Sequence, residues 1–297
     1  MSANDEHADR FTLLRPLLFT IAYEITGSAT EADDVLQDSY LRWATVDLED
    51  VRDTKAYLAQ LVTRQALNTL RSQARRREDY IGPWLPEPLL LDEHDGAADV
   101  VLAESVSMAM LVVLETLTPD ERAVFVLREV FGFSHDEIAD AIGKSTVAVR
   151  QMAHRAREHV HSRRRRFEPL DPQQSEQITT QFLTAAATGD IDGLMAMLAP
   201  DVVFTSDSAG KVSAARRPIL GADKVARFIL GLFRLAGPQH RIEAATYNSA
   251  PALVVYDNEQ PASVFMIEFT DSKITNFYAM RNPDKLAAVT VRREISR

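Results

Sequence analysis

The stretch SHDEIADAIGKSTVAVRQMAHRARE, residues 134–158, predicts two helices joined by a tight turn. Ser134 and Glu137 have the spacing of a capping box, so a short helix is expected over 134–142. Gly143 can take the left-handed conformation that ends this helix, and Ser145 can cap a second helix from Thr146 to about Arg163. This length of turn is typical of a helix-turn-helix.

The second predicted helix is apolar on one side and polar on the other. Its apolar residues Val149 and Met152 can pack on Ile138, Ala139 and Ile142 of the first helix. The exposed side then carries Arg150, Gln151, His154, Arg155 and Arg157 as candidate DNA contacts. Arginine and glutamine can read base edges in the major groove, and arginine also neutralises phosphate.

Charge supports the same interpretation. From Lys144 to Arg166 there are 8 Lys or Arg and a single acid, Glu158, although the whole chain has a net charge of −10. We interpret the basic segment as a DNA footprint. The alternative is a solvated basic helix in some other bundle.

Residues 10–78 are predicted to be all-helical. Ser28 and Glu31 form a second capping box, and Leu36, Tyr40 and Trp43 follow on one apolar stripe. The opposite face carries Asp33, Asp34, Gln37 and Asp38. Residues 1–53 hold 12 acids against 4 Lys or Arg, which favours a protein partner over phosphate or else a solvated surface.

A further helix is expected from about Thr54 to Arg77. Its residues Arg64, Asn68 and Arg71 are spaced i, i+4, i+7 and therefore share one face. After it, Pro83, Pro86 and Pro88 exclude helix and predict a linker over 79–96. The apolar residues between these prolines, Trp84 and Leu85 among them, predict that the linker packs on a surface.

From residue 169 onward, a helical pattern gives way to strands. DVVFTSDS, PALVVYDN, ASVFMIEF and KITNFYAM are β-rich, and a helix over 222–235 interrupts them. A run of antiparallel strands with helices predicts an α+β domain. The fold class is therefore multidomain, with helical domains at 1–78 and 97–168, the linker at 79–96 and the α+β domain at 169–297.

Composition excludes several function classes. The chain has no cysteine, so disulfides and thiol chemistry are excluded, and we identify no metal or cofactor motif. The N-terminus lacks an apolar signal core, and no apolar run approaches the ~18 residues of a membrane span. These features favour a cytoplasmic protein with no membrane partner, which we expect to be a monomer when free.

Two segments together resemble extracytoplasmic-function sigma factors of the sigma-70 family. TPDERAVFVLREVFGFSHDEIADAIGKSTVAVRQMAHRARE, residues 118–158, is similar to region 4 of that family. EADDVLQDSYLRWA, residues 31–44, and DTKAYLAQLVTRQALNTLRSQARRRE, residues 53–78, are similar to region 2. The tail resembles a SnoaL-like cone, and WLPEP at 84–88 and NPDKL at 282–286 are similar to motifs of the sigma subfamily that carries this extension.

The resemblance implies roles for the residues above. Asp33, Asp34, Gln37 and Asp38 would bind the β′ subunit of core RNA polymerase. The loop near Val46–Asp53 with Arg64, Asn68 and Arg71 would open the −10 element. The −35 element of promoter DNA would be read by Arg150, Gln151, His154 and Arg155. Arg64 stands where the family often has Asn. The interdomain contacts would be made by Trp84, Leu85, Pro86, Asn282, Pro283, Asp284, Lys285 and Leu286.

Two other functions stay open from the residues alone. One is a ligand-sensing transcriptional regulator that uses only the helix-turn-helix. The other is a cyclase- or isomerase-like enzyme, for which the tail offers the polar candidates Asp201, Asp207, His240, Tyr256 and Glu268. No catalytic residue, metal or cofactor is assigned, because no acid–base pair or ligand spacing is identifiable.

Overall fold

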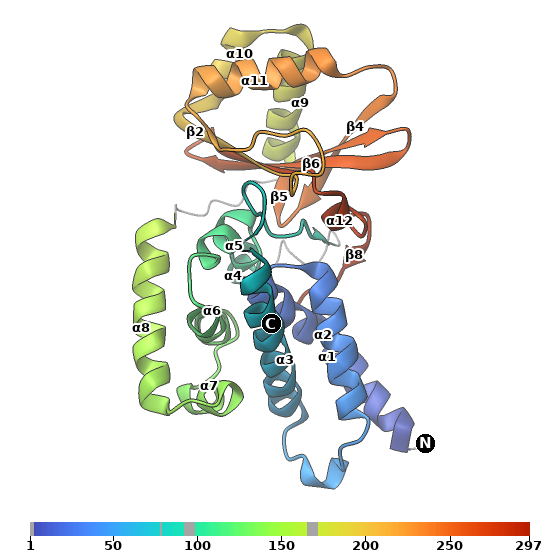
Figure 1. Ribbon diagram of the computed structural model, residues 1–297, viewed down its shortest axis with the longest axis vertical. Coiled ribbons are helices and arrows are strands. Elements are labelled where there is room, and N and C mark those ends of the chain that lie inside the picture. Colours follow the sequence, from blue (N-terminus) through green and yellow to red (C-terminus); the bar gives the residue numbers. More distant parts are fainter. Residues whose placement is uncertain (1–2, 78, 92–98, 165–171) are drawn as a thin grey trace.

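The computed structural model describes residues 3–77, 79–91, 99–164 and 172–297. Figure 1 shows a helical part below and a sheet covered by further helices above it. The elements of the helical part are α1 (Ala3–Thr26), α2 (Ala29–Trp43), η1 (Leu48–Asp50), α3 (Thr54–Arg77), α4 (Val100–Ser105), α5 (Met108–Leu114), α6 (Pro119–Phe125), the π-helical turn η2 (Val126–Val130), α7 (His135–Ile142) and α8 (Thr146–Arg163).

The helix starts follow the local signals in the sequence. The Ser28 hydroxyl accepts a hydrogen bond from the Glu31 amide at 3.1 Å and caps α2. Ser134 caps α7 in a complete capping box, and Gly143 ends that helix at φ +70°. Ser145 caps α8. The predicted helix-turn-helix is therefore confirmed, with Ile138 and Val149 fully buried between its two helices.

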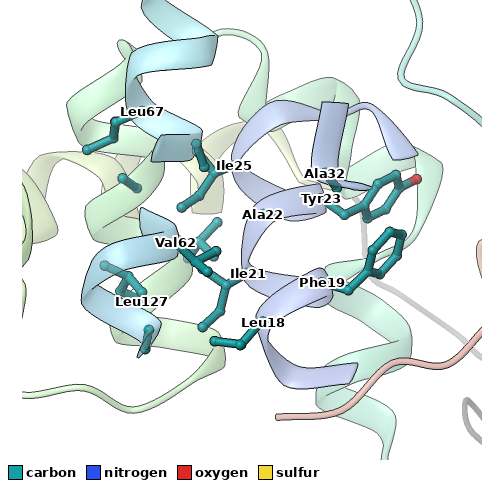
Figure 2. Packing of buried hydrophobic residues seen from close by; sticks show 14 of the residues in the cluster. Leu18, Phe19, Ile21, Ala22, Tyr23, Ile25, Ala32, Val62, Leu67 and Leu127 are labelled. Atoms are coloured by element: carbon teal, nitrogen blue, oxygen red, sulfur yellow. The ribbon is translucent and has the colours of Figure 1, made fainter. Parts of the chain in front are cut away.

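Both sets of helices share a continuous apolar core. Figure 2 shows Leu18 and Ile21 of α1 beside Val62 of α3 and Leu127 of η2. Because η2 and α7 pack on α1 and α3, the helix-turn-helix rests directly against the N-terminal helices. The sequence pattern predicts each helical unit but not this shared core, since it is made of contacts between distant residues.

The upper part contains a mixed sheet and three covering helices (Figure 1). Its elements are α9 (Pro172–Thr188), α10 (Ile191–Met197), β2 (Leu198–Asp207), β3 (Ile219–Leu220), α11 (Ala222–Leu235), β4 (His240–Tyr247), β5 (Ala250–Asp257), β6 (Gln260–Thr270), β7 (Lys273–Met280), α12 (Pro283–Leu286) and β8 (Arg292–Arg293). Together with β1 (Leu90–Leu91), the sheet has the order β3-β2-β7-β6-β5-β4-β1-β8.

The α+β prediction is confirmed, with one correction. We expected antiparallel strands throughout, but β2 pairs parallel with β7, and β1 pairs parallel with β8. Alternation of apolar residues indicates a strand but not the direction of its neighbour, so the pattern could not distinguish these pairs. The prediction also missed β4, whose half-exposed residues HRIEAATY alternate only weakly.

The two faces of the sheet have different partners. Phe265 and Ile267 of β6 point toward α9, α10 and α11 and join the core of the upper part. Val264 and Met266, which alternate with them, point to the other side and pack with Leu85 of the proline-rich segment and Met108 of α5. The second face is therefore the interface between the upper and lower parts.

The last residues return to the helical part. Arg292 and Arg293 form β8 beside β1, and Ile295 is buried in the core shared by the helices. Arg297 is paired with Asp99 ahead of α4. The upper part is thus attached through its sheet face and through its C-terminal segment.

Candidate polymerase and promoter interfaces

The helix-turn-helix presents a polar surface on α8. Arg150, Gln151, His154 and Arg155 are all exposed, while Val149, Met152 and Ala156 are buried behind them. Arg155 lies 3.4 Å from Glu121, and His154 lies 3.7 Å from Glu158. Arg150 and Gln151 make no side-chain hydrogen bond to any residue that the structure describes. Their donors are therefore available to a nucleic acid.

The acidic helix α2 keeps three of its four predicted residues available. Asp34, Gln37 and Asp38 are exposed, whereas Asp33 is half-buried. Asp33 pairs with Arg15 of α1 at 3.2 Å and with Arg293 of β8 at 2.6 Å. The C-terminal segment therefore reaches the edge of the predicted polymerase surface.

The face of α3 predicted for −10 DNA is partly covered by the helix-turn-helix. Arg64 donates to the carbonyl oxygens of Asp140 at 2.7 Å and Ala141 at 3.1 Å, at the C-terminal end of α7. This placement suits a cation, because unpaired carbonyls at a helix end carry partial negative charge. Asn68, one turn further along, is exposed.

Arg71 makes a second bridge between the two helical units. It pairs with Asp120 of α6 at 2.6 Å, and Lys144 in the turn of the helix-turn-helix reaches the same carboxylate at 3.0 Å. Partial burial opposes ionisation of Asp120, but hydrogen bonds from Arg71 and Lys144 outweigh it and lower the pKa of that carboxyl. Two of the three predicted −10 residues are thus engaged within the protein.

The residues predicted to join the parts meet around one buried carboxylate. Asp207, at the end of β2, is fully buried and accepts from the Tyr80 hydroxyl at 2.5 Å and the Leu85 amide at 2.9 Å. The Lys285 ammonium lies 2.7 Å from the same carboxylate. Burial, followed by the hydrogen bond to Asp207, raises the pKa of Tyr80 and keeps it a donor. We call Tyr80, Leu85, Asp207 and Lys285 the clasp.

The motif NPDKL supports the clasp from one side. The Lys285 ammonium is 3.9 Å from the ring centroid of Trp84, and it donates to the Leu85 carbonyl at 2.5 Å. Asn282 caps α12 and donates to the Tyr80 hydroxyl at 2.9 Å. Of the remaining residues predicted to join the parts, Pro86 and Leu286 are buried, whereas Pro283 and Asp284 are exposed. Asp284 forms an ion pair with Lys211.

Besides Tyr80 in the clasp, Glu87 and Asn248 also hold the parts together and were not predicted as contacts. Glu87 places its carboxylate at the start of α2, where it accepts from the Ser28 hydroxyl at 2.7 Å and the Thr30 amide at 3.0 Å. Asn248, in the β4–β5 hairpin, is fully buried at φ +51°. The sequence signals were that Glu87 is a charged residue between two prolines and that Asn248 is an asparagine at a hairpin turn. Neither signal identifies the residue that would be contacted.

The polar residues considered for catalysis do not converge. Asp207 is occupied in the clasp, and Glu268 accepts from Asn276 and Tyr278 on the interface side of the sheet. His240 lines a cavity on the opposite side. Within the described residues, no group of three His, Cys, Asp or Glu is arranged to hold a metal. None of the described helices is long and apolar enough to cross a membrane.

Comparison with known proteins assigns both helical units. Residues 11–76 match Sigma-70 region 2, and residues 107–160 match Sigma-70, region 4. The chain is 39% identical to the ECF RNA polymerase sigma factor SigJ of Mycobacterium tuberculosis (strain ATCC 25618 / H37Rv) over 93% of this chain and 91% of that protein. This chain belongs to the ECF sigma factors.

Other comparisons agree with this assignment. The Mycobacterium tuberculosis (strain ATCC 25618 / H37Rv) Probable ECF RNA polymerase sigma factor SigI is 30% identical over 96% of this chain and 97% of its own. The crystal structure of the Mycobacterium tuberculosis extracytoplasmic function sigma factor SigJ superposes with a TM-score of 0.75, at 34% identity, over 96% of this chain and 99% of that one. That overlap includes the upper α+β part.

Family membership decides between the alternatives. A sigma factor acts with RNA polymerase on promoter DNA, and the presence of region 2 as well as region 4 separates it from a regulator that carries only a helix-turn-helix. The relatives are sigma factors and not enzymes, so the cyclase- or isomerase-like alternative is rejected.

Proposed function

We propose that this sigma factor opens the −10 element with α3 and reads the −35 element with α8, while α2 docks on the β′ subunit of core RNA polymerase. The −10 element is contacted by Arg64, Asn68 and Arg71. The −35 element is contacted by Arg150, Gln151, His154 and Arg155. The β′ subunit is contacted by Asp33, Asp34, Gln37 and Asp38. We further propose a cytoplasmic monomer with units at 1–78, 97–168 and 169–297 joined by 79–96.

One observation supports a regulated version of this function. Two of the five donors of the Arg64 guanidinium are bonded to the carbonyls of Asp140 and Ala141, so α7 lies against the face of α3 that carries the proposed −10 contacts. Arg71 is likewise held by Asp120. The described arrangement is therefore a closed state, from which region 4 has to leave α3 before region 2 can engage a promoter.

The upper part is placed to set the stability of this closed state. Asn248 donates to Tyr23 of α1 and to Val106 between α4 and α5, so it contacts region 2 and the segment just before region 4 together. The clasp fixes residues 80–85 between them. We propose that the α+β part acts as a regulator in cis by holding the two DNA-binding units in the packed arrangement.

Reconstituted transcription tests the proposed function. Purified core polymerase with the full chain should give defined transcripts from a cognate promoter, and core alone should not. Replacing Arg64 with Ala removes its hydrogen bonds to α7 and any contact that it makes to −10 DNA. The control is Asp140→Ala, which keeps the hydrogen bonds and the DNA contact, because Arg64 is bonded to the backbone carbonyl of residue 140 and not to its side chain. In the complex with core polymerase, where region 4 has already left α3, the Arg64→Ala protein should bind −10 DNA more weakly, and unchanged binding there would contradict the −10 assignment.

A charge reversal tests the β′ assignment separately. Asp34→Lys with Asp38→Lys should weaken binding to core by at least tenfold, because both acids are exposed on one face of α2. The helix should still fold, since its buried residues Leu36 and Trp43 are unchanged. The matched control is Asp192→Lys with Asp201→Lys, an equal change of charge on the exposed surface of the upper part. Equal affinities in both double variants would refute the assignment.

A further inference from the structure

A cavity of about 370 Å³ lies between the sheet and α11 of the upper part, away from the polymerase and promoter surfaces. Its volume falls in the lower part of the range of ~300–1,000 Å³ that is usual for small-molecule sites. At ~30 Å³ for each water in the liquid, it has room for about a dozen non-hydrogen atoms. The cavity is therefore suited to a small ligand and not to a peptide or nucleotide.

The walls of this cavity are predominantly apolar. Six phenylalanines line it, from α9, β2, α11, β6 and β7: Phe182, Phe204, Phe228, Phe233, Phe265 and Phe277. Ile229, Leu232 and Leu253 add aliphatic surface. Such walls favour an aromatic or aliphatic group through burial of apolar area.

An arginine faces this apolar space. Arg281 follows β7 and lies on the same side of the strand as Phe277 and Ala279, four and two residues earlier, so it also lines the cavity. Its Nη1 donates to the carbonyl oxygen of Ser213, while its Nε is buried and has no hydrogen-bond partner. No acid among the described residues forms an ion pair with it.

This arginine is in an unfavourable environment when the cavity is unfilled. Burial lowers the pKa of the Arg281 guanidinium from its ordinary value, although arginine stays charged in proteins. A buried donor without an acceptor destabilises the folded state. An anionic oxygen brought in by a ligand offsets the loss of solvation of the guanidinium charge.

The charge of the cavity limits the class of anion. A carboxylate carries one negative charge and can accept from the N–H groups of Nη2, which remain after Nη1 has bonded to Ser213 and while Nε is covered by the protein. A phosphate dianion would leave an uncompensated negative charge among phenylalanines. The other ionisable residues of the wall are His240 and Asp257, and the carboxylate of Asp257 is exposed.

We propose that the upper part binds a small apolar carboxylate, an arylalkanoic or medium-chain alkanoic acid, with its carboxylate on Arg281 and its apolar group among the phenylalanines. The site adjoins the clasp, because the amide of Arg281 donates to the carbonyl oxygen of Asp207 at 2.7 Å.

Calorimetric titration of the full chain with 4-phenylbutyrate tests this proposal, with the neutral isostere 4-phenylbutyramide as the paired probe. Saturable binding at one site per chain is expected, at least tenfold tighter for the carboxylate than for the amide. Arg281→Gln should weaken carboxylate binding at least tenfold and leave amide binding unchanged. Arg234→Gln, which changes an exposed arginine outside the cavity, should leave both unchanged.

Several results would overturn the proposal. These are no saturable binding of either 4-phenylbutyrate or decanoate, equal affinity for carboxylate and amide, or full carboxylate affinity in the Arg281→Gln protein. If circular dichroism shows that Arg281→Gln fails to fold, Arg281→Lys replaces it. That variant keeps the positive charge but loses the guanidinium donors, so it should bind the carboxylate more weakly than the natural chain. Equal affinity of the two proteins for the carboxylate would again refute the site.

Discussion

The amide Nδ2 of Asn248 donates a hydrogen bond of 2.7 Å to the hydroxyl oxygen of Tyr23, across 225 positions of sequence. The same nitrogen donates to the carbonyl of Val106 at 2.8 Å, and Oδ1 accepts from the amide of Leu89 at 2.8 Å. One side chain of a β-hairpin thus contacts region 2, the segment before region 4 and the proline-rich connection. Its complete burial makes each of these hydrogen bonds costly to lose.

Replacing Asn248 with Ala should destabilise the whole chain. It leaves buried polar groups of Tyr23, Leu89 and Val106 without this partner, so we expect a loss of about 2–3 kcal/mol in the free energy of unfolding by urea. Asn258→Ala is the control, because Asn258 also has positive φ in a hairpin but is exposed. Equal losses in the two variants would mean that backbone conformation, and not the junction, accounts for the effect.

Loss of the Lys285 charge should loosen the clasp. Lys285→Met can still pack on Trp84 but leaves the buried carboxylate of Asp207 without its cation, a change that costs about 3–5 kcal/mol for buried pairs. Hydrogen exchange of residues 80–91, followed by mass spectrometry, should become faster. Lys211→Met removes a lysine from an exposed pair with Asp284 and should have little effect. Unchanged exchange in the Lys285→Met protein would show that the clasp does not hold this segment.

The recognition surface of α8 makes a separate prediction. Arg150→Ala should reduce discrimination between −35 sequences by about 1–3 kcal/mol if this arginine contacts a base edge. Arg157→Ala is the matched change on the same helix, because Arg157 is paired with Glu129 at 2.6 Å. Binding of a panel of −35 variants measures both. A uniform loss over all sequences in the Arg150→Ala protein would indicate phosphate contact instead.

The pH dependence of stability should depend on Glu24. Burial raises the pKa of this carboxyl from 4.5 to about 8, against the opposing hydrogen bond from Ser105 and the charge of Arg122. The folded chain then binds more protons than the unfolded chain between these values, so the contribution of Glu24 is complete below the lower pKa and is lost as pH rises through the upper one.

Glu24→Gln removes this titration while its side-chain oxygen can still accept from Ser105. Urea unfolding of the two proteins should therefore give similar free energies near pH 5. Near pH 8 the variant should be more stable by an amount on the order of a few kcal/mol, since each pKa unit corresponds to ~1.4 kcal/mol. Parallel pH profiles would show that Glu24 is not held protonated.

Local signals made the helical units predictable from the sequence. Ser134 and Ser145 cap the first turns of α7 and α8, and Gly143 ends α7. Each interacts only with the nearest turn of helix, so the helix-turn-helix follows from their spacing. The motifs WLPEP and NPDKL, which contain the contacting residues Trp84 and Lys285, stood out only through a resemblance to known proteins. Composition alone could place Trp84 on a surface but could not say which one.

Contacts between distant residues were not predictable in the same way. Arg64 was assigned to DNA, yet it is bonded to carbonyls of α7, which have no sequence signature because every residue has a carbonyl. Arg281 was not considered, because its position in a cavity depends on the pairing of β6 with β7. The parallel pair of β2 and β7 likewise depends on how α9 to α11 cover the sheet.

The two DNA-binding units are packed together in this structure, and the proposed function requires them to separate on polymerase. The chain has no cysteine, so Lys55→Cys on α3 and Glu158→Cys on α8, both at exposed positions, allow a pair of spin labels without background. Pulsed electron–electron double resonance measures the distance between the two labels. It should give one narrow distance distribution for the free protein and a longer distance in the complex with core polymerase. An unchanged distribution in a verified complex would contradict the claim.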